Sequence, residues 1–325
     1  MTLSLASVKS IAFVMSPRLG DALLAMIIVN NLQLNGYKVT IFSNYLTGLQ
    51  RWFPGMQIKP YPDESQCQAV LQPFDLLLHS YPRDVLYQAN SWHPRVVILD
   101  HFPLYRRQIS MVEIQVAVCK ELLKLPLVVR ENGLNAPPGL QFRKNSQRII
   151  IHPTASEFAK YWLLERFCTM ARRLQAEGYD PEFVVAPSEK PQVSMLENQG
   201  FLVTAQPSLD TLAQYIYESA WFIGNDSGIG HLASNLGIPT VSLMQRRKIM
   251  QRWRPDWAPG EAVLPWMPLL LRPLKERAWK YFISVNQVLR AFRRLKVSVA
   301  EELNSLSHKR GSAVLTPFEK GGRRP

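Results

Sequence analysis

The chain has 325 residues, of which 47% are hydrophobic and 19% charged, so it holds ample apolar material for a core and wholesale disorder is excluded. This length exceeds that of a usual single domain and favours two domains. The formal net charge of +13 favours an anionic partner, which could be nucleic acid, acidic lipid or a phosphorylated substrate.

Membrane spans, disulfide bonds and a signal peptide are not expected. The longest uninterrupted apolar run, residues 22–29, is far below the roughly 20 residues that cross a bilayer. Cys67, Cys119 and Cys168 are isolated and lack paired zinc or redox spacing, which favours a reducing, cytoplasmic compartment. Lys9 and Arg18 are the only basic residues among the first twenty, and Lys9 follows the opening apolar residues, which is atypical of a signal peptide.

The first half alternates apolar runs with a helical pattern. Residues 10–16 form a compact apolar run before Pro17 and Gly20, which predicts a strand and a loop. Residues 21–36 follow with helical periodicity and end on a glycine, which predicts a helix. Further strands are predicted at residues 37–44, 74–80 and 95–100. Buried strands that alternate with helices indicate a parallel sheet covered on both faces.

The pattern restarts in the second half. Residues 131–147 are rich in Pro, Gly, Asn and charge and lack an apolar period, so a domain boundary is expected there. A helix is predicted at residues 161–178, and strands at 148–154, 182–188, 221–226 and 239–244.

We therefore predict an α/β protein with two Rossmann-like, doubly wound parallel-sheet domains that face a cleft. The expected domains are residues 1–140 and 147–297, and ligands should bind beyond the carboxyl ends of the strands. Residues 298–325 are basic and are expected to form a solvated, disordered tail. A weak contact of this tail with an anionic membrane surface is the alternative.

The segment FIGNDSGIGHLASNLG, residues 222–237, joins a predicted strand to a predicted helix that begins near Ser227. Free N–H groups at such a helix start form an anion site, and Gly228 lets a phosphate approach the backbone. Asp226 or Ser227 could instead simply cap the helix. A serine nucleophile is excluded because the Gly-X-Ser-X-Gly elbow is absent, and no Walker A, dinucleotide-binding or metal-binding motif is present.

Four motifs occur in one order along the chain. They are SPRLGDALLAMIIVNNL (residues 16–32), HPTASEFAKYW (152–162), VVAPSEK (184–190) and DSGIGHLA (226–233), and FISVNQVLRAF (282–292) follows them as a closing helix. With these motifs the sequence resembles glycosyltransferase family 9, the ADP-heptose lipopolysaccharide heptosyltransferases and their relatives. The resemblance implies the GT-B fold, in which two Rossmann-like domains face a cleft.

The resemblance implies inverting, metal-independent transfer of a heptose-type sugar from an ADP-sugar to a lipopolysaccharide core acceptor. No cofactor is implied, because the nucleotide sugar is a substrate. Asp21 would be the general base for the acceptor hydroxyl, or else a carboxylate that stabilises a helix start. Lys160 would neutralise the leaving diphosphate, or else be a solvated lysine.

The same resemblance implies the donor-binding residues. Ser227 and Gly228 would receive the diphosphate, Asp226 would bind hydroxyls of the transferred sugar, and His231 would support the phosphate loop. Thr154 would add a hydroxyl to a phosphate or cap a strand end, and Glu189 would hold the ribose hydroxyls or be a surface carboxylate. His231 could equally have only a structural role.

Other partners and functions stay open at this point. Ala155 and Glu157 stand where the family often has a threonine and a basic residue, so another nucleotide sugar or glycan acceptor is an alternative, as is a non-catalytic binding protein. The acceptor site is unknown, although Arg83, His101, Arg106 and Arg107 could face acidic sugars. Residues 245–257 mix basic and Trp residues, but nucleic acid is not an expected partner. The expected partners are a nucleotide sugar and a lipid-linked glycan acceptor, with peripheral contact to the inner membrane as an option.

Overall fold

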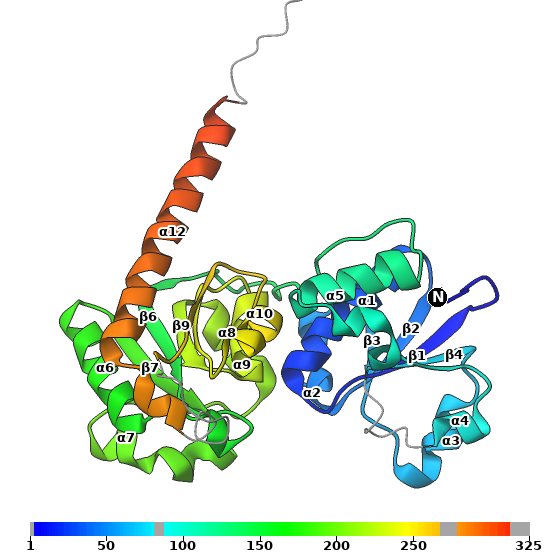
Figure 1. The fold of residues 1–325 in the computed structure, drawn as a ribbon, viewed down its shortest axis with the longest axis horizontal. Coiled ribbons are helices and arrows are strands. Elements are labelled where there is room, and N and C mark those ends of the chain that lie inside the picture. The colour runs from blue at the N-terminus through cyan, green and yellow to red at the C-terminus, as the bar shows by residue number, and fades with distance from the viewer. Residues whose placement is uncertain (1–2, 81–87, 267–277, 313–325) are drawn as a thin grey trace, which may run out of the picture.

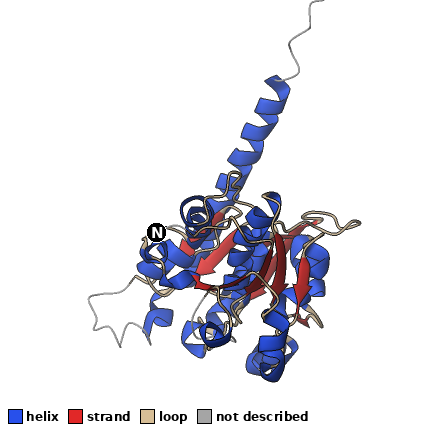
Figure 2. Ribbon diagram, turned by 90° about the vertical axis from the view of Figure 1, so that its right-hand side faces the viewer, coloured by secondary structure: helices blue, strands red, loops and turns tan. Residues whose placement is uncertain are grey.

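The structure is a computed structural model that describes residues 3–80, 88–266 and 278–312 (Figure 1). The described residues form two sheets, one in each half of the chain, and every strand pair in them is parallel. The two halves lie side by side, and helices pack against each sheet (Figures 1 and 2). The fold class predicted from the sequence is therefore confirmed.

The first sheet has the strand order β3-β2-β1-β4-β5. Its strands are β1 (Ser10–Val14), β2 (Lys38–Phe42), β3 (Gln57–Lys59), β4 (Leu76–His79) and β5 (Val96–Ile98). The helices of this half are α1 (Leu19–Leu34), α2 (Asn44–Thr47), α3 (Cys67–Leu71), α4 (Ala89–Trp92), α5 (Met111–Ala117) and the π-helix η5 (Val118–Leu122). This order reverses direction between β1 and β4, which is the switch point where doubly wound sheets bind ligands.

The second sheet has the order β11-β10-β9-β6-β7-β8, with its switch point between β6 and β9. Its strands are β6 (Asn145–His152), β7 (Asp180–Val185), β8 (Val203–Ala205), β9 (Ser219–Asn225), β10 (Thr240–Leu243) and β11 (Gly260–Val263). The helices are α6 (Leu164–Ala176), α7 (Ser194–Asn198), α8 (Leu209–Tyr217), α9 (Gly228–Asn235), α10 (Arg247–Trp253) and α12 (Val285–Ser312). Short 3-10 turns are η1 (Gln50–Trp52), η2 (Glu64–Gln66), η3 (Leu99–His101), η4 (Pro103–Arg106), η6 (Phe158–Lys160), η7 (Pro187–Val193) and η8 (Trp279–Phe282).

Helix α1 is apolar on nearly all sides, and its surroundings explain why. Every residue from Leu19 to Leu32 is buried except Asp21 and Asn30, which are half-buried. The helix packs against β2, against α5, and against α9 of the other domain. A helix with an apolar surface all round is stable only when neighbours cover all of it. By contrast, α6 buries one stripe, formed by Phe167, Cys168, Met170, Ala171 and Leu174.

The domain interface combines a continuous apolar cluster with buried polar pairs. One cluster of buried residues includes Leu23 of α1 together with Leu232 of α9. Asn132 lies in the segment expected to join the domains and is buried; its Nδ2 donates to Leu23 O at 3.0 Å and to Asn235 Oδ1 at 2.8 Å. These bonds fix the connecting segment in the interface and hold the domains close together.

Helix α12 first packs against the second domain and then extends away from it (Figure 1). Val288, Phe292, Leu295 and Val299 on its apolar face are buried in the second hydrophobic cluster. Because this face continues to Val299, the tail boundary expected at residue 298 falls inside a helix. Residues 313–325, the rest of the expected tail, lie outside the described residues. Among the described helices, none is both long and apolar enough to cross a bilayer.

Candidate active site

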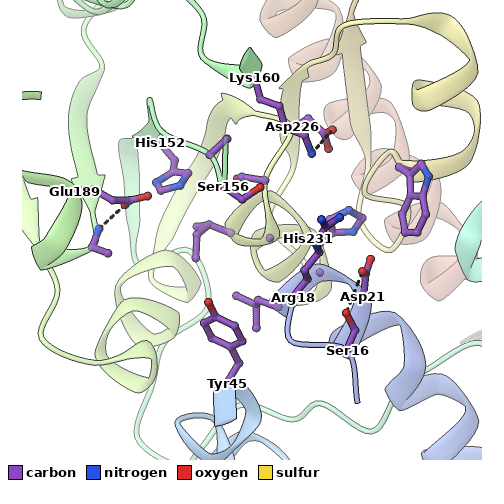
Figure 3. A pocket seen from close by; sticks show the side chains of 18 of the residues that line it. Ser16, Arg18, Asp21, Tyr45, His152, Ser156, Lys160, Glu189, Asp226 and His231 are labelled. Atoms are coloured by element: carbon purple, nitrogen blue, oxygen red, sulfur yellow. Dashed lines mark hydrogen bonds and ion pairs between the residues drawn. The ribbon is translucent and has the colours of Figure 1, made fainter. Parts of the chain in front are cut away.

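A cavity of about 690 Å³ lies between the two domains, at the carboxyl ends of both sheets. The first domain contributes the loop after β1, the start of α1, and Tyr45 of α2. The second contributes the loops after β6, β7 and β9, together with Ile249 and Trp253 of α10. Both switch points therefore open onto one cavity, and polar side chains from both domains point into it (Figure 3).

The loop between β9 and α9 forms one wall of the cavity. Ser227 is the N-cap of α9, and its Oγ accepts a hydrogen bond from Gly230 N at 3.4 Å. The capping role considered for Ser227 is thus present. Capping satisfies one donor only, whereas the first N–H groups of a helix lack intrahelical partners. Ser227, Gly228 and Ile229 all line the cavity, so this wall can receive an anion.

Asn225, the last residue of β9, joins this wall to the loop after β6. Its Nδ2 donates to Pro153 O at 2.6 Å, and its Oδ1 accepts from Trp162 N at 3.1 Å. That loop ends at Lys160, whose Nζ lies 3.4 Å from Asp226 Oδ2 (Figure 3). Lys160 and Asp226, which the sequence placed in separate roles, therefore form one ion pair at the cavity wall.

Thr154 is the predicted site residue that the structure keeps out of the cavity. It is fully buried, and its Oγ1 lies 3.2 Å from Nε2 of His152. Nδ1 of His152 donates to Val184 O at 2.8 Å, and burial lowers the pKa of His152, so the ring is neutral and its Nε2 accepts from the threonine hydroxyl. The Thr154 hydroxyl thus makes its hydrogen bond to His152 inside the protein. Ala155 and Ser156, which follow it, line the cavity instead. The expected phosphate contact of Thr154 is therefore corrected to a structural role.

Glu189 lines the opposite end of the cavity, at the start of η7. Its Oε2 accepts a hydrogen bond from Ala186 N at 2.8 Å, which fixes the carboxylate to the end of β7 (Figure 3). One carboxylate oxygen is held by the backbone, and the group is well placed to bind hydroxyls of a ligand.

The first domain contributes Asp21, in the first turn of α1. Ser16 Oγ donates to Asp21 Oδ2 at 3.2 Å, which orients the carboxylate in the cavity (Figure 3). Asp21 thus lies on the first-domain side of the cavity, while Ser227 and Lys160 lie on the second-domain side.

The starts of α1 and α9 are in direct contact because both carry glycine. A Cβ built on Gly228 would lie 3.0 Å from Leu19 Cβ and 3.1 Å from Gly20 N, and one built on Gly20 would lie 2.9 Å from Cδ2 of His231. His231 is 5% exposed, its Nδ1 has no hydrogen-bond partner in the described part of the chain, and burial lowers its pKa. A neutral His231 therefore supports the contact between the two loops.

The basic residues considered for acceptor binding lie elsewhere. His101, Arg106 and Arg107 do not line the cavity. Arg106 pairs with Asp100 at 3.0 Å and Arg107 with Glu121 at 2.6 Å, as expected of loop charges. Arg83 lies outside the described residues.

Several cavity residues were not predicted. Ser16 opens the first quoted motif but was given no role, Arg18 lies in that motif without being singled out, and Tyr45 carries no sequence signal at all. The basic and aromatic segment at residues 245–257 forms α10, which reaches across the interface, where Arg252 Nη2 donates to Tyr105 O. In the ranges that the structure describes, no group of three or more His, Cys, Asp or Glu could hold a metal ion.

The two parallel-sheet domains with a cavity between them have the architecture of the GT-B fold. The model of glycosyltransferase family 9 (heptosyltransferase) matches residues 103–260 of the chain. The E. coli ADP-heptose lps heptosyltransferase II is similar, with a TM-score of 0.67, 17% identity, and coverage of 90% of this chain and 99% of that one. A glycosyl transferase family 9 protein from Veillonella parvula matches with a TM-score of 0.69, 17% identity, and coverage of 92% and 99%.

The E. coli heptosyltransferase WaaC, solved with ADP, matches with a TM-score of 0.63, 13% identity, and coverage of 88% of this chain and 99% of that one. No curated protein matches the chain by sequence. At these identities the solved structures establish a common fold.

Proposed function

We propose that the chain is an inverting, metal-independent transferase that moves a heptose-type sugar from an ADP-sugar to a hydroxyl of a lipopolysaccharide core acceptor. It would act at the cytoplasmic face of the inner membrane on a lipid-linked acceptor. The observation that carries the proposal is the shared cavity, in which a carboxylate from one domain and an anion-binding wall from the other line the same space. The match to the heptosyltransferase family supports the sugar and nucleotide.

The second domain would hold the donor. Glu189, fixed through Ala186 N, would bind the ribose hydroxyls. The α9 amides at Gly228 and the ammonium of Lys160 would bind the diphosphate, and Asp226 would bind hydroxyls of the sugar while keeping Lys160 in place. WaaC has been solved with ADP and with ADP-2-deoxy-2-fluoro heptose, which supports an ADP-linked donor for this chain too.

The first domain would supply the base. Asp21 would take the proton of the acceptor hydroxyl while the acceptor oxygen forms a bond to the anomeric carbon. The bond from that carbon to the diphosphate oxygen breaks, and its electron pair leaves with the nucleoside diphosphate. Inversion requires that the acceptor hydroxyl attack the face of the anomeric carbon opposite to the departing diphosphate.

Donor turnover by the purified protein with truncated core acceptors tests this function. Replacing Asp21 with Asn should lower turnover by about 10²- to 10⁴-fold, as removal of a general base does, while nucleotide affinity stays unchanged. The matched control is Asp63→Asn, because Asp63 is exposed and does not line the cavity. Turnover by Asp21→Asn at the wild-type rate would refute the role of Asp21 as the general base. A thermal-shift preference for UDP or GDP over ADP would refute the ADP-linked donor.

A further inference from the structure

Among the described residues, the charged side chains that line the cavity offer a diphosphate little positive charge. They are two cations, Arg18 and Lys160, and three carboxylates, Asp21, Glu189 and Asp226. The formal sum is −1, whereas a diphosphate is itself an anion. Lys160 is already paired with Asp226 at 3.4 Å, so its charge is partly compensated before any ligand arrives.

Arg18 is the lining cation whose charge is available. It is exposed, and no ion pair or hydrogen bond ties its guanidinium to another residue of the described chain. Arg18 is the N-cap residue of α1, but its side chain makes no capping hydrogen bond. Neither a local partner nor a helix contact explains an arginine at this position.

The packing of the two domains places the residue after Arg18 against the anion-binding wall. Leu19, the next residue, is close enough to Gly228 that a Cβ on Gly228 would approach Leu19 Cβ to 3.0 Å. Arg18, Ser227 and Gly228 all line the same cavity, and Arg18 is among the side chains that Figure 3 labels there. An anion bound at the start of α9 would therefore share its cavity with the Arg18 side chain.

We propose that Arg18 binds the diphosphate of the donor from the first domain and stabilises the nucleoside diphosphate as it leaves. This inference rests on the proposed function. A guanidinium suits the role because its planar, forked donors can bind two phosphate oxygens at once, and its charge persists at any working pH. The electron pair of the breaking bond passes to a diphosphate oxygen, so a cation there acts where negative charge grows.

The position of Arg18 also links donor binding to the base. Arg18 and Asp21 belong to the same loop and first turn of α1. A diphosphate held between Arg18 and the α9 amides would draw the two domains together and fix the segment that carries Asp21. Lys160 cannot do this, because it lies on the same domain as α9.

The test compares Arg18→Gln, Arg18→Lys and the control Arg290→Gln. Arg290 is an exposed arginine of α12 whose Nε bonds only to Asn286 O of its own helix, at 3.3 Å. Calorimetry with ADP, AMP and adenosine is combined with steady-state donor turnover.

We expect Arg18→Gln to weaken ADP binding and lower kcat/KM for the donor by about 10- to 100-fold, the usual loss for a hydrogen bond to a charged group. In Arg18→Gln the affinity for AMP should fall less than that for ADP, and the affinity for adenosine should be unchanged. Arg18→Lys should recover part of the lost ADP affinity, and Arg290→Gln should match the wild type.

Two results would overturn the role of Arg18 and leave the function intact: unchanged ADP affinity in Arg18→Gln, or an increase confined to the KM of the acceptor. Equal weakening of ADP and adenosine would show a merely structural effect and would also overturn it. A wild-type protein that binds no nucleotide would refute the inference and the proposed function together.

Discussion

The contact between the starts of α1 and α9 predicts opposite outcomes for two glycines of one helix. In Gly228→Ala the new Cβ would lie 3.0 Å from Leu19 Cβ and 3.1 Å from Gly20 N. Neither atom is the end of a flexible side chain, so the start of α1 must give way by a few tenths of an ångström. Overpacking of this kind costs roughly 1–3 kcal/mol, more than the gain of up to about 1 kcal/mol from alanine in a helix.

Gly230→Ala is the matched control. Its Cβ would meet the Phe222 ring at 3.6 Å and other atoms no closer than 3.9 Å, which is ordinary contact. Only the helix preference of alanine remains, so this variant should gain about 0.5–1 kcal/mol in the free energy of unfolding.

Urea unfolding and donor turnover separate the two variants. Gly228→Ala should be less stable than wild type and lose about 10- to 100-fold in kcat/KM, because a small displacement of reacting groups is costly. Gly230→Ala should keep its activity. If Gly228→Ala had the same stability in urea and the same donor turnover as Gly230→Ala, the close approach of the two helix starts would be refuted.

Two further predictions concern stability. Gly224→Ala should lower the free energy of unfolding by roughly 1–3 kcal/mol in urea titrations, because its Cβ would lie 2.8 Å from the backbone oxygen of His152 in the neighbouring strand; wild-type stability would contradict this packing. The thermal midpoint should fall as the pH drops below 6.5, the ordinary pKa of histidine, because burial lowers the pKa of both His152 and His231. The unfolded chain then binds protons that the folded chain does not, so protonation favours unfolding by up to roughly 1 kcal/mol per group and pH unit. A midpoint that stays level from pH 6.5 to about 5 would show that these rings are not buried as neutral groups.

The strands missed by the sequence patterns are all at sheet edges. β3, β8 and β11 have three or four residues each and are only partly buried. Central strands such as β1 and β9 are covered on both faces and must be continuously apolar, which makes them visible in the sequence. An edge strand is held mainly by backbone bonds to its neighbour, and such bonds leave no pattern in residue type.

In the candidate site, too, the sequence motifs indicated some features and only the structure showed others. Asp21, Lys160, Glu189 and Asp226 were found because each lies in a motif, and all four line the cavity. Thr154 lies in a motif too, but the neutral ring of His152 takes its hydroxyl, and only the three-dimensional neighbourhood shows this.

By itself, the sequence determined the two parallel sheets, their helices and the loops that bear polar groups, because apolar periodicity and glycine placement act over a few residues. The tertiary structure alone decided how the domains meet. The contact of Gly20 with His231, the ion pair of Lys160 with Asp226 and the close approach of Leu19 to Gly228 all join residues distant in sequence. These contacts follow from packing between surfaces, which no local pattern of residues encodes.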